Sequence, residues 1–196
     1  MDFFENIAKE VGEEYITHIN DIQEHETFVE TGSYIFNALV SGSIFGGVSG
    51  NRITAIAGET STGKTYFATA VVKNYLNDNP DGAVFYFDTE GAIERDLLVS
   101  RGITERFYKV DVATVEEFRH QAYKILDNYM KEPEENRRPM MFVLDSLGMM
   151  STTKETEDTL NDKQVRDMTK SQLIKGTFRI LTSKLAKANV PMIVTN

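Results

Sequence analysis

The segment Gly58–Thr65, with the sequence GETSTGKT, constrains the fold and chemistry of this chain more than any other segment. It matches the pattern G-x-x-x-x-G-K-S/T, follows a short apolar run and precedes a stretch with helical periodicity. Glycine residues let the backbone of such a loop turn so that successive N–H groups point at phosphate oxygens. The helix that follows presents the positive end of its dipole to the same anion. The segment therefore predicts a phosphate-binding loop between a strand and a helix.

The residues of this loop have distinct predicted roles. The Lys64 ammonium is expected to reach the β- and γ-phosphates of a nucleotide, and the Thr65 hydroxyl to ligate Mg²⁺. The alternative is a glycine-rich turn between a strand and a helix that binds nothing. The nucleotide-binding residues predicted in this segment are Gly58, Glu59, Thr60, Ser61, Thr62, Gly63, Lys64, Thr65 and Tyr66.

Apolar runs with the character of buried strands recur along the chain. Near-continuous apolar strands indicate a sheet that is covered on both faces, and such sheets are usually parallel. Four strong runs and a weaker fifth are predicted as strands at 52–58, 83–90, 139–147, 190–196 and 107–112.

Segments with helical periodicity separate these runs. One helix is predicted over 64–77, and another over 114–132, where Thr114 and Glu117 form a capping box. A last helix is indicated by the spacing of Ile174, Phe178, Leu181 and Leu185. Strands that alternate with helices predict an α/β fold, with a mostly parallel sheet flanked by helices.

Acidic residues stand at the ends of two predicted strands. Asp145 follows five apolar residues in MMFVLDSL, the Walker B arrangement, in which a carboxylate holds Mg²⁺ through its waters. Asp88 and Glu90 end another strand in VFYFDTEG. Hydrolysis of a nucleotide needs a base to orient and deprotonate water, and Glu90 is the candidate base. The alternative is that both acids only cap or solvate the strand end.

Composition excludes several classes of function. The 196 residues include no cysteine, which rules out disulfides, thiolate metal sites and thiol nucleophiles within this sequence. His18, His25 and His120 are too scattered to suggest a zinc site. No segment has the length and apolar character of a membrane helix, and the acidic N-terminus lacks the features of a signal peptide. A cytoplasmic location without membrane partners is therefore expected.

Charge is distributed unevenly around a net value of −9, which argues against a uniformly basic nucleic-acid binder. Between Lys163 and Lys187 the chain carries seven basic residues and a single acidic one, Asp167. These basic residues could neutralise phosphates of single-stranded DNA, although a solvated helix face is the commoner fate of such charges. The candidate DNA contacts are Lys163, Arg166 and Lys170.

The segments GETSTGKT, FYFDTEGAI and MFVLDSLGMM, in this order and spacing, resemble the core of RecA-type recombinases. The stretch KETEDTLN, with DMTK after it, makes the chain most similar to the RecA-like recombinases of T-even bacteriophages. The resemblance covers about residues 28–196 and implies a RecA-like P-loop ATPase that binds ATP and Mg²⁺. It further implies a filament or smaller oligomer on single-stranded DNA, acting in DNA recombination and repair, in the cytoplasm of a host cell if a phage encodes it.

The resemblance also assigns residues. Lys64 and Glu90 would be catalytic, Asp145 would be the Walker B acid that binds the metal with Thr65, and Ser146 would lie near the metal. Residues 152–164 occupy the position of the first DNA-binding loop. RecA-type proteins place an aromatic residue over the adenine about seven residues after the catalytic glutamate. Leu97 stands there in this chain, so apolar packing against the base is expected instead.

The predicted organisation is an N-terminal helical arm over 1–30, followed by a RecA-like ATPase core over 31–196 that is incomplete at its C-terminal end. Phe3, Phe4 and Ile7 could pack the arm onto a neighbouring protomer or onto the chain itself. Two other functions remain open on the same fold. One is a nucleotide-gated assembly or regulatory module without DNA activity, and the other is a helicase-type motor.

Overall fold

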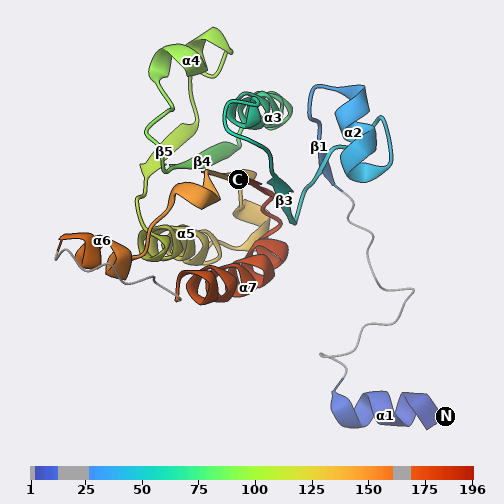
Figure 1. Ribbon diagram of the computed structural model, residues 1–196. Helices are drawn as coiled ribbons and strands as arrows, with labels where there is room; N and C mark the ends of the chain where they lie inside the picture. The colour runs from blue at the N-terminus through green and yellow to red at the C-terminus, as the bar shows by residue number, and fades with distance from the viewer. Residues whose placement is uncertain (1–2, 13–26, 161–168) are drawn as a thin grey trace.

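The computed structural model describes residues 3–12, 27–160 and 169–196, and its centre is a five-stranded parallel sheet (Figure 1). The strand order is β3-β7-β6-β4-β5, and every neighbouring pair in this sheet is parallel. The strands are β3 (Ile53–Ile56), β4 (Ala83–Asp88), β5 (Phe107–Asp111), β6 (Met140–Asp145) and β7 (Met192–Thr195). The α/β class and the parallel sheet predicted from the apolar runs are confirmed.

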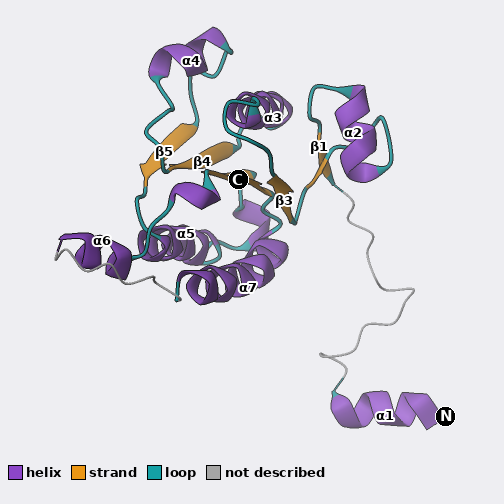
Figure 2. Cartoon of the chain, in the orientation of Figure 1, coloured by secondary structure: helices purple, strands orange, loops and turns teal. Residues whose placement is uncertain are grey.

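Helices cover both faces of the sheet, as Figure 2 shows. On one face lie α3 (Lys64–Asp78) and α4 (Arg95–Ser100), which pack on a core that includes Tyr86 and Val143. On the other face lie α5 (Val115–Tyr129) and α7 (Lys170–Ala188), over a core that includes Phe87 and Phe142. The side chains of a strand point alternately to the two faces, so these strands must be apolar on both.

The carboxyl ends of the strands meet at one edge of the sheet. In the register of β4 and β6, Asp88 lies opposite Asp145. The chain after β3 turns into α3 at this same edge, because parallel strands share one direction. The phosphate-binding loop and both acidic strand ends are therefore brought together, although 80 residues separate Thr65 from Asp145 in sequence.

The observed elements differ from the predicted ones mainly at their ends. The strands predicted at 52–58, 83–90, 139–147 and 190–196 are each shorter by two to three residues, while 107–112 matches β5 closely. The capping box of α5 is present, since Thr114 and Glu117 bond each other's backbone N–H groups. The predicted DNA-binding loop is partly helical, because α6 (Thr153–Leu160) forms within it. Among the described residues, short 3₁₀ helices form at η3 (Glu134–Asn136) and η4 (Leu147–Met149).

The N-terminal region is only partly helical. The helix α1 (Phe3–Val11) has no buried residue, and Phe3 and Phe4 are largely exposed. Next in the described chain, β1 (Phe28–Val29) pairs antiparallel with β2 (Val48–Ser49), and α2 (Tyr34–Ser41) connects them. A helical arm reaching residue 30 is thus wrong at 28–29, because these residues form a strand. The division into an arm and a core, and the packing of the arm on a second protomer, stay predictions.

Within the described ranges, no helix is both long enough and apolar enough to cross a membrane.

Candidate nucleotide-binding site

The loop Gly58–Gly63 ends at the N-terminus of α3, which has no capping side chain. Gly63 is the N-cap residue, with φ +93°, and no side chain bonds the first turn of the helix. No acidic residue lies in that turn either. The first N–H groups of a helix need partners, and here the helix itself supplies none, so its positive end is available to an anion. A side chain at Gly63 would be strained at this φ, which explains the glycine.

Lys64 lies over this loop. Its Nζ donates hydrogen bonds to the carbonyl oxygens of Gly58 and Glu59, both at 2.8 Å. Thr62 Oγ1 also donates to Glu59 O, at 2.8 Å, and this bond stabilises the turn. The ammonium is thereby held at the mouth of the loop, where an anion bound by the backbone would meet it.

Asp145 is buried at the end of β6 and accepts hydrogen bonds from three hydroxyls. Its Oδ2 accepts from Thr65 Oγ1 at 2.7 Å and from Tyr86 Oη at 2.6 Å, and its Oδ1 accepts from Thr195 Oγ1. Thr65 and Asp145 are therefore adjacent, as a shared Mg²⁺ site requires. Tyr86 and Thr195 are site residues that sequence reasoning missed.

Burial first, and the negative charge of Asp145 second, raise the pKa of Tyr86 far above its usual value. The hydroxyl therefore stays protonated and donates to the carboxylate, which fixes one Asp145 oxygen. Oxygen ligands held in this way are typical of a site for a hard cation. In the described part of the chain, no group of three or more acidic or histidine side chains forms a metal cluster.

Replacing Tyr86 with phenylalanine is expected to make the free energy of unfolding fall less steeply as pH rises above 10. Because the folded-state pKa is raised, the unfolded chain loses this proton first, so stability is present below pH 10 and falls as pH rises above it. Tyr86 should contribute up to about 1.4 kcal/mol per pH unit to that fall. Urea unfolding followed by circular dichroism between pH 8 and 12 measures it. The exposed Tyr108, changed to phenylalanine, is the control and should keep the parent slope; an unchanged slope in Tyr86→Phe contradicts the assignment.

The two acids after β4 have different roles. The Asp88 carboxylate accepts N–H bonds from Glu90, Gly91 and Ile93 at 2.9–3.2 Å. It also pairs with Lys109 Nζ at 3.1 Å; the contact of Lys109 with Asp111 first, and this one second, raise the pKa of Lys109. Asp88 is buried and acts on the backbone of the loop that carries Glu90, as the capping interpretation predicted for both acids.

Glu90 instead lines a cleft at this edge of the sheet. Its Oε1 accepts a hydrogen bond from Ser146 Oγ at 2.9 Å. Ser146 is joined to the same loop through its N–H, which donates to Thr89 Oγ1 at 2.7 Å. Thr89 N–H in turn donates to Asp145 O at 2.9 Å. These bonds fix the candidate base beside the candidate metal ligand.

A cleft of about 460 Å³ unites these groups. Most of the predicted site residues line it, while Glu59, Thr62 and Tyr66 do not. Asn196, Gly148 and Met149 line it without having been predicted. The lining residues are Gly58, Thr60, Ser61, Gly63, Lys64, Thr65, Glu90, Asp145, Ser146, Gly148, Met149 and Asn196. An uncapped helix N-terminus, a lysine, a hydroxyl–carboxylate pair and a second carboxylate are the donor set that a magnesium–nucleotide complex needs.

Comparison with known proteins agrees with this geometry. The sequence model of the RecA N-terminal domain family matches residues 2–196. The chain belongs to this family. It is 33% identical over 169 residues to the recombination and repair protein of Enterobacteria phage T4, covering 86% of this chain and 42% of the phage protein. Protein RecA of Malacoplasma penetrans is 29% identical over 178 residues, which are 87% of this chain and 51% of that protein.

A third relative is the DNA repair and recombination protein RadB of Thermoplasma acidophilum. It is 27% identical over 176 residues, which are 89% of this chain and 69% of RadB. The chain thus spans about half the length of the first two relatives. The RecA-type recombinase family predicted from the motifs is confirmed.

Leu97, which stands where an aromatic residue was expected, is half-buried in this RecA-family chain. It packs with α3 and β4 against the apolar core on that face of the sheet. Contact between Leu97 and a nucleobase stays a prediction.

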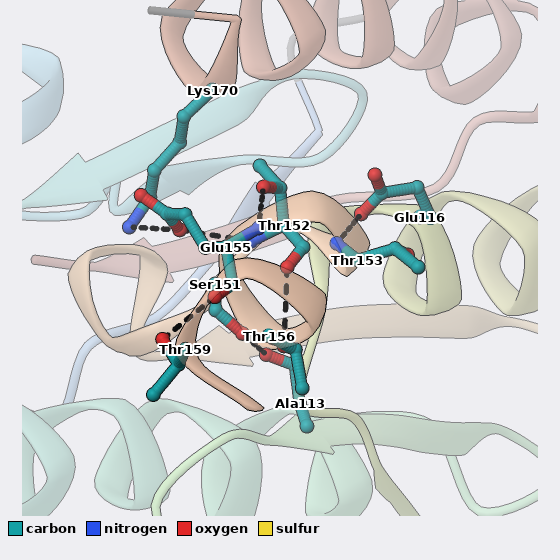
Figure 3. Close-up of polar contacts among 9 residues, drawn as sticks. All are labelled: Ala113, Glu116, Ser151, Thr152, Thr153, Glu155, Thr156, Thr159 and Lys170. Atoms are coloured by element: carbon teal, nitrogen blue, oxygen red, sulfur yellow. Dashed lines mark hydrogen bonds and ion pairs between the residues drawn. The ribbon is translucent and has the colours of Figure 1, made fainter. Parts of the chain in front are cut away.

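Of the candidate DNA contacts, Lys163 and Arg166 lie outside the described residues. Lys170 begins α7, and its Nζ lies 3.7 Å from Glu155 Oε2 on α6 (Figure 3). Glu155 and Thr152 form a second capping box, with N–H bonds of 2.9 and 3.0 Å. Thr153 N–H donates to Glu116 Oε2 on α5 at 3.2 Å, so α6 is anchored to α5 as well. The start of α7 is thereby tied to the segment expected to contact DNA.

Proposed function

We propose that this chain binds MgATP in the cleft and hydrolyses it. The observation that carries the proposal is the convergence of Lys64, the Thr65–Asp145 pair and Glu90 at the uncapped N-terminus of α3. In the complete protein, ATP binding would organise a filament on single-stranded DNA for homologous strand exchange. Membership of the RecA family, and relatives named for recombination and repair, support this second step.

Each site residue has a role in this proposal. The N–H groups of the loop and of the first turn of α3 bind phosphate oxygens, and the Lys64 ammonium binds the terminal phosphates. Thr65 and Asp145 hold Mg²⁺, which when bound neutralises charge on the phosphates. Glu90 orients and deprotonates the attacking water, and Ser146 fixes the Glu90 carboxylate through its hydroxyl.

The direct test measures ATP hydrolysis by the chain with and without single-stranded DNA. Stimulation by DNA, with DNA binding that weakens steeply as salt rises, is the expected result for a recombinase. ATP binding and self-association without any effect of DNA would instead favour the nucleotide-gated assembly. That alternative has an observation in its favour, because α6 is acidic and carries no aromatic residue on which a base could stack.

Combined replacement of Lys163, Arg166 and Lys170 by alanine is expected to weaken DNA binding uniformly across sequences. For single strands the salt slope falls by about 0.7 for each phosphate that is no longer neutralised, so the triple variant should have a slope smaller by about 2 units. Fluorescence anisotropy with a labelled oligonucleotide, titrated with salt, measures it. Lys124→Ala, at an exposed position of α5, is the control and should bind as the parent does. If the triple variant keeps the salt slope of the parent, these three residues do not contact DNA.

A further inference from the structure

Tyr66 is an exposed aromatic residue directly beside the candidate site. It follows Thr65 in the first turn of α3, and its exposed fraction is 66%. It lies outside the lining of the cleft, which ends at Thr65 on this side. Tyr66 is therefore a mostly solvent-exposed aromatic side chain beside the candidate nucleotide site, and its ring can stack on a ligand.

Arg101 covers one face of this ring. Its guanidinium carbon lies 3.8 Å from the ring centroid, and Nη1 donates to the Tyr66 carbonyl oxygen at 2.9 Å. Arg101 Nε is buried and has no hydrogen-bond partner in the described ranges. The stacked guanidinium orients the ring, and Tyr66 stays largely exposed to solvent beside it.

The position of Arg101 links this stack to the catalytic loop. The connection from β4 to β5 begins with the loop that carries Glu90, continues through α4, and reaches Arg101 at the C-cap of α4. Leu97 on α4 packs into the core, so its side chain is already engaged. The connection between β4 and β5 therefore contacts the exposed start of α3 through Arg101, which lies against Tyr66.

We infer that Tyr66, backed by Arg101, is the stacking surface for the base of the bound nucleotide. The inference rests on the proposed function, because it assumes that phosphates bind along Gly58–Thr65, the segment that Tyr66 directly follows. A tyrosine face backed by a guanidinium stacks on any purine, since every base has a π-face. The surface therefore contributes affinity for ATP and GTP alike, and selection between the two comes from other groups.

The test compares dissociation constants of ATP, GTP and inorganic tripolyphosphate, each with Mg²⁺, for the parent and Tyr66→Ala. Loss of stacking should weaken ATP and GTP about tenfold and leave tripolyphosphate unchanged. Tyr66→Phe keeps the ring and should bind as the parent does. Tyr34→Ala is a matched control, because Tyr34 is 65% exposed and lies at the start of α2.

Three outcomes overturn the inference while the proposed function stands: unchanged ATP affinity in Tyr66→Ala, an equal loss of tripolyphosphate affinity, or a loss for ATP but not for GTP. If the parent binds neither ATP nor tripolyphosphate, the proposed function itself is rejected.

A second measurement depends on fluorescence rather than affinity. The chain has no tryptophan, so Tyr66→Trp introduces a single tryptophan, which can be excited selectively, at the stacking position. Its emission should be quenched by ATP and GTP and unaffected by tripolyphosphate, while Tyr34→Trp should respond to none of the three. Absence of quenching by ATP at concentrations that saturate the site would overturn the inference.

Discussion

Lys64→Ala is expected to lower the affinity of the chain for ATP about 100-fold. Hydrogen bonds that involve a charged group contribute about 1.5–3 kcal/mol each, and the ammonium is the cationic side chain in the lining of the cleft. Its present bonds to the Gly58 and Glu59 carbonyls are exposed, so its removal leaves these oxygens to water. The free energy of unfolding should therefore change by less than about 1 kcal/mol.

Isothermal titration with MgATP and with tripolyphosphate measures this effect. Both ligands should lose affinity in Lys64→Ala, because the ammonium contacts phosphate and not the base. The matched control is Lys73→Ala, which removes an exposed ammonium from the same helix about two and a half turns further on and should bind ATP as the parent does. Parent-like affinity in Lys64→Ala would reject the phosphate-binding role of the loop and leave the glycine-rich turn as the interpretation of Gly58–Thr65.

The strands and the phosphate-binding loop are predictable because their signals are local. A parallel strand buried on both faces is apolar throughout, and a loop that cradles phosphate needs glycine at fixed positions. The predicted strands 52–58 and 83–90 extend too far at their carboxyl ends, where the loops of the site begin. β3 ends at Ile56, before the phosphate-binding turn, and β4 ends at Asp88, whose carboxylate accepts from the N–H groups of Glu90 and Gly91 and turns the chain there.

The partners of Asp145 could not be predicted from the sequence. Tyr86 and Thr195 reach this carboxylate only because β4 and β7 flank β6 in one register, and strand order is a tertiary property. The stack of Arg101 on Tyr66, 35 residues away, has the same origin. The capping box of α6 is different. Thr152 and Glu155 carry the same local signature as the box of α5, but the resemblance to RecA-type proteins implies a DNA-binding loop over 152–164, so no helix is predicted there from the sequence.

Glu90→Gln is expected to reduce ATP hydrolysis by a factor of about 10²–10⁴ and to change ATP affinity by less than about twofold. The amide has the same shape as the carboxylate and keeps an oxygen to accept the Ser146 hydroxyl bond, so the cleft should stay intact. It cannot take a proton from water, and only turnover depends on that step. Phosphate release and nucleotide binding, measured on the same preparation, separate the two effects.

Two further variants distinguish a base from an acid that shapes the loop. Glu94→Gln, at an exposed position of the same crossover, should leave both hydrolysis and binding unchanged. Asp88→Asn weakens the bonds to the Glu90, Gly91 and Ile93 N–H groups and the pair with Lys109, so it should lower stability together with turnover. Loss of turnover at full stability is therefore specific to a residue that acts on the reacting water. If Glu90→Gln hydrolyses ATP at the parent rate, the base must be another group, and the Glu90–Ser146 contact would then be a structural link between the β4 and β6 loops.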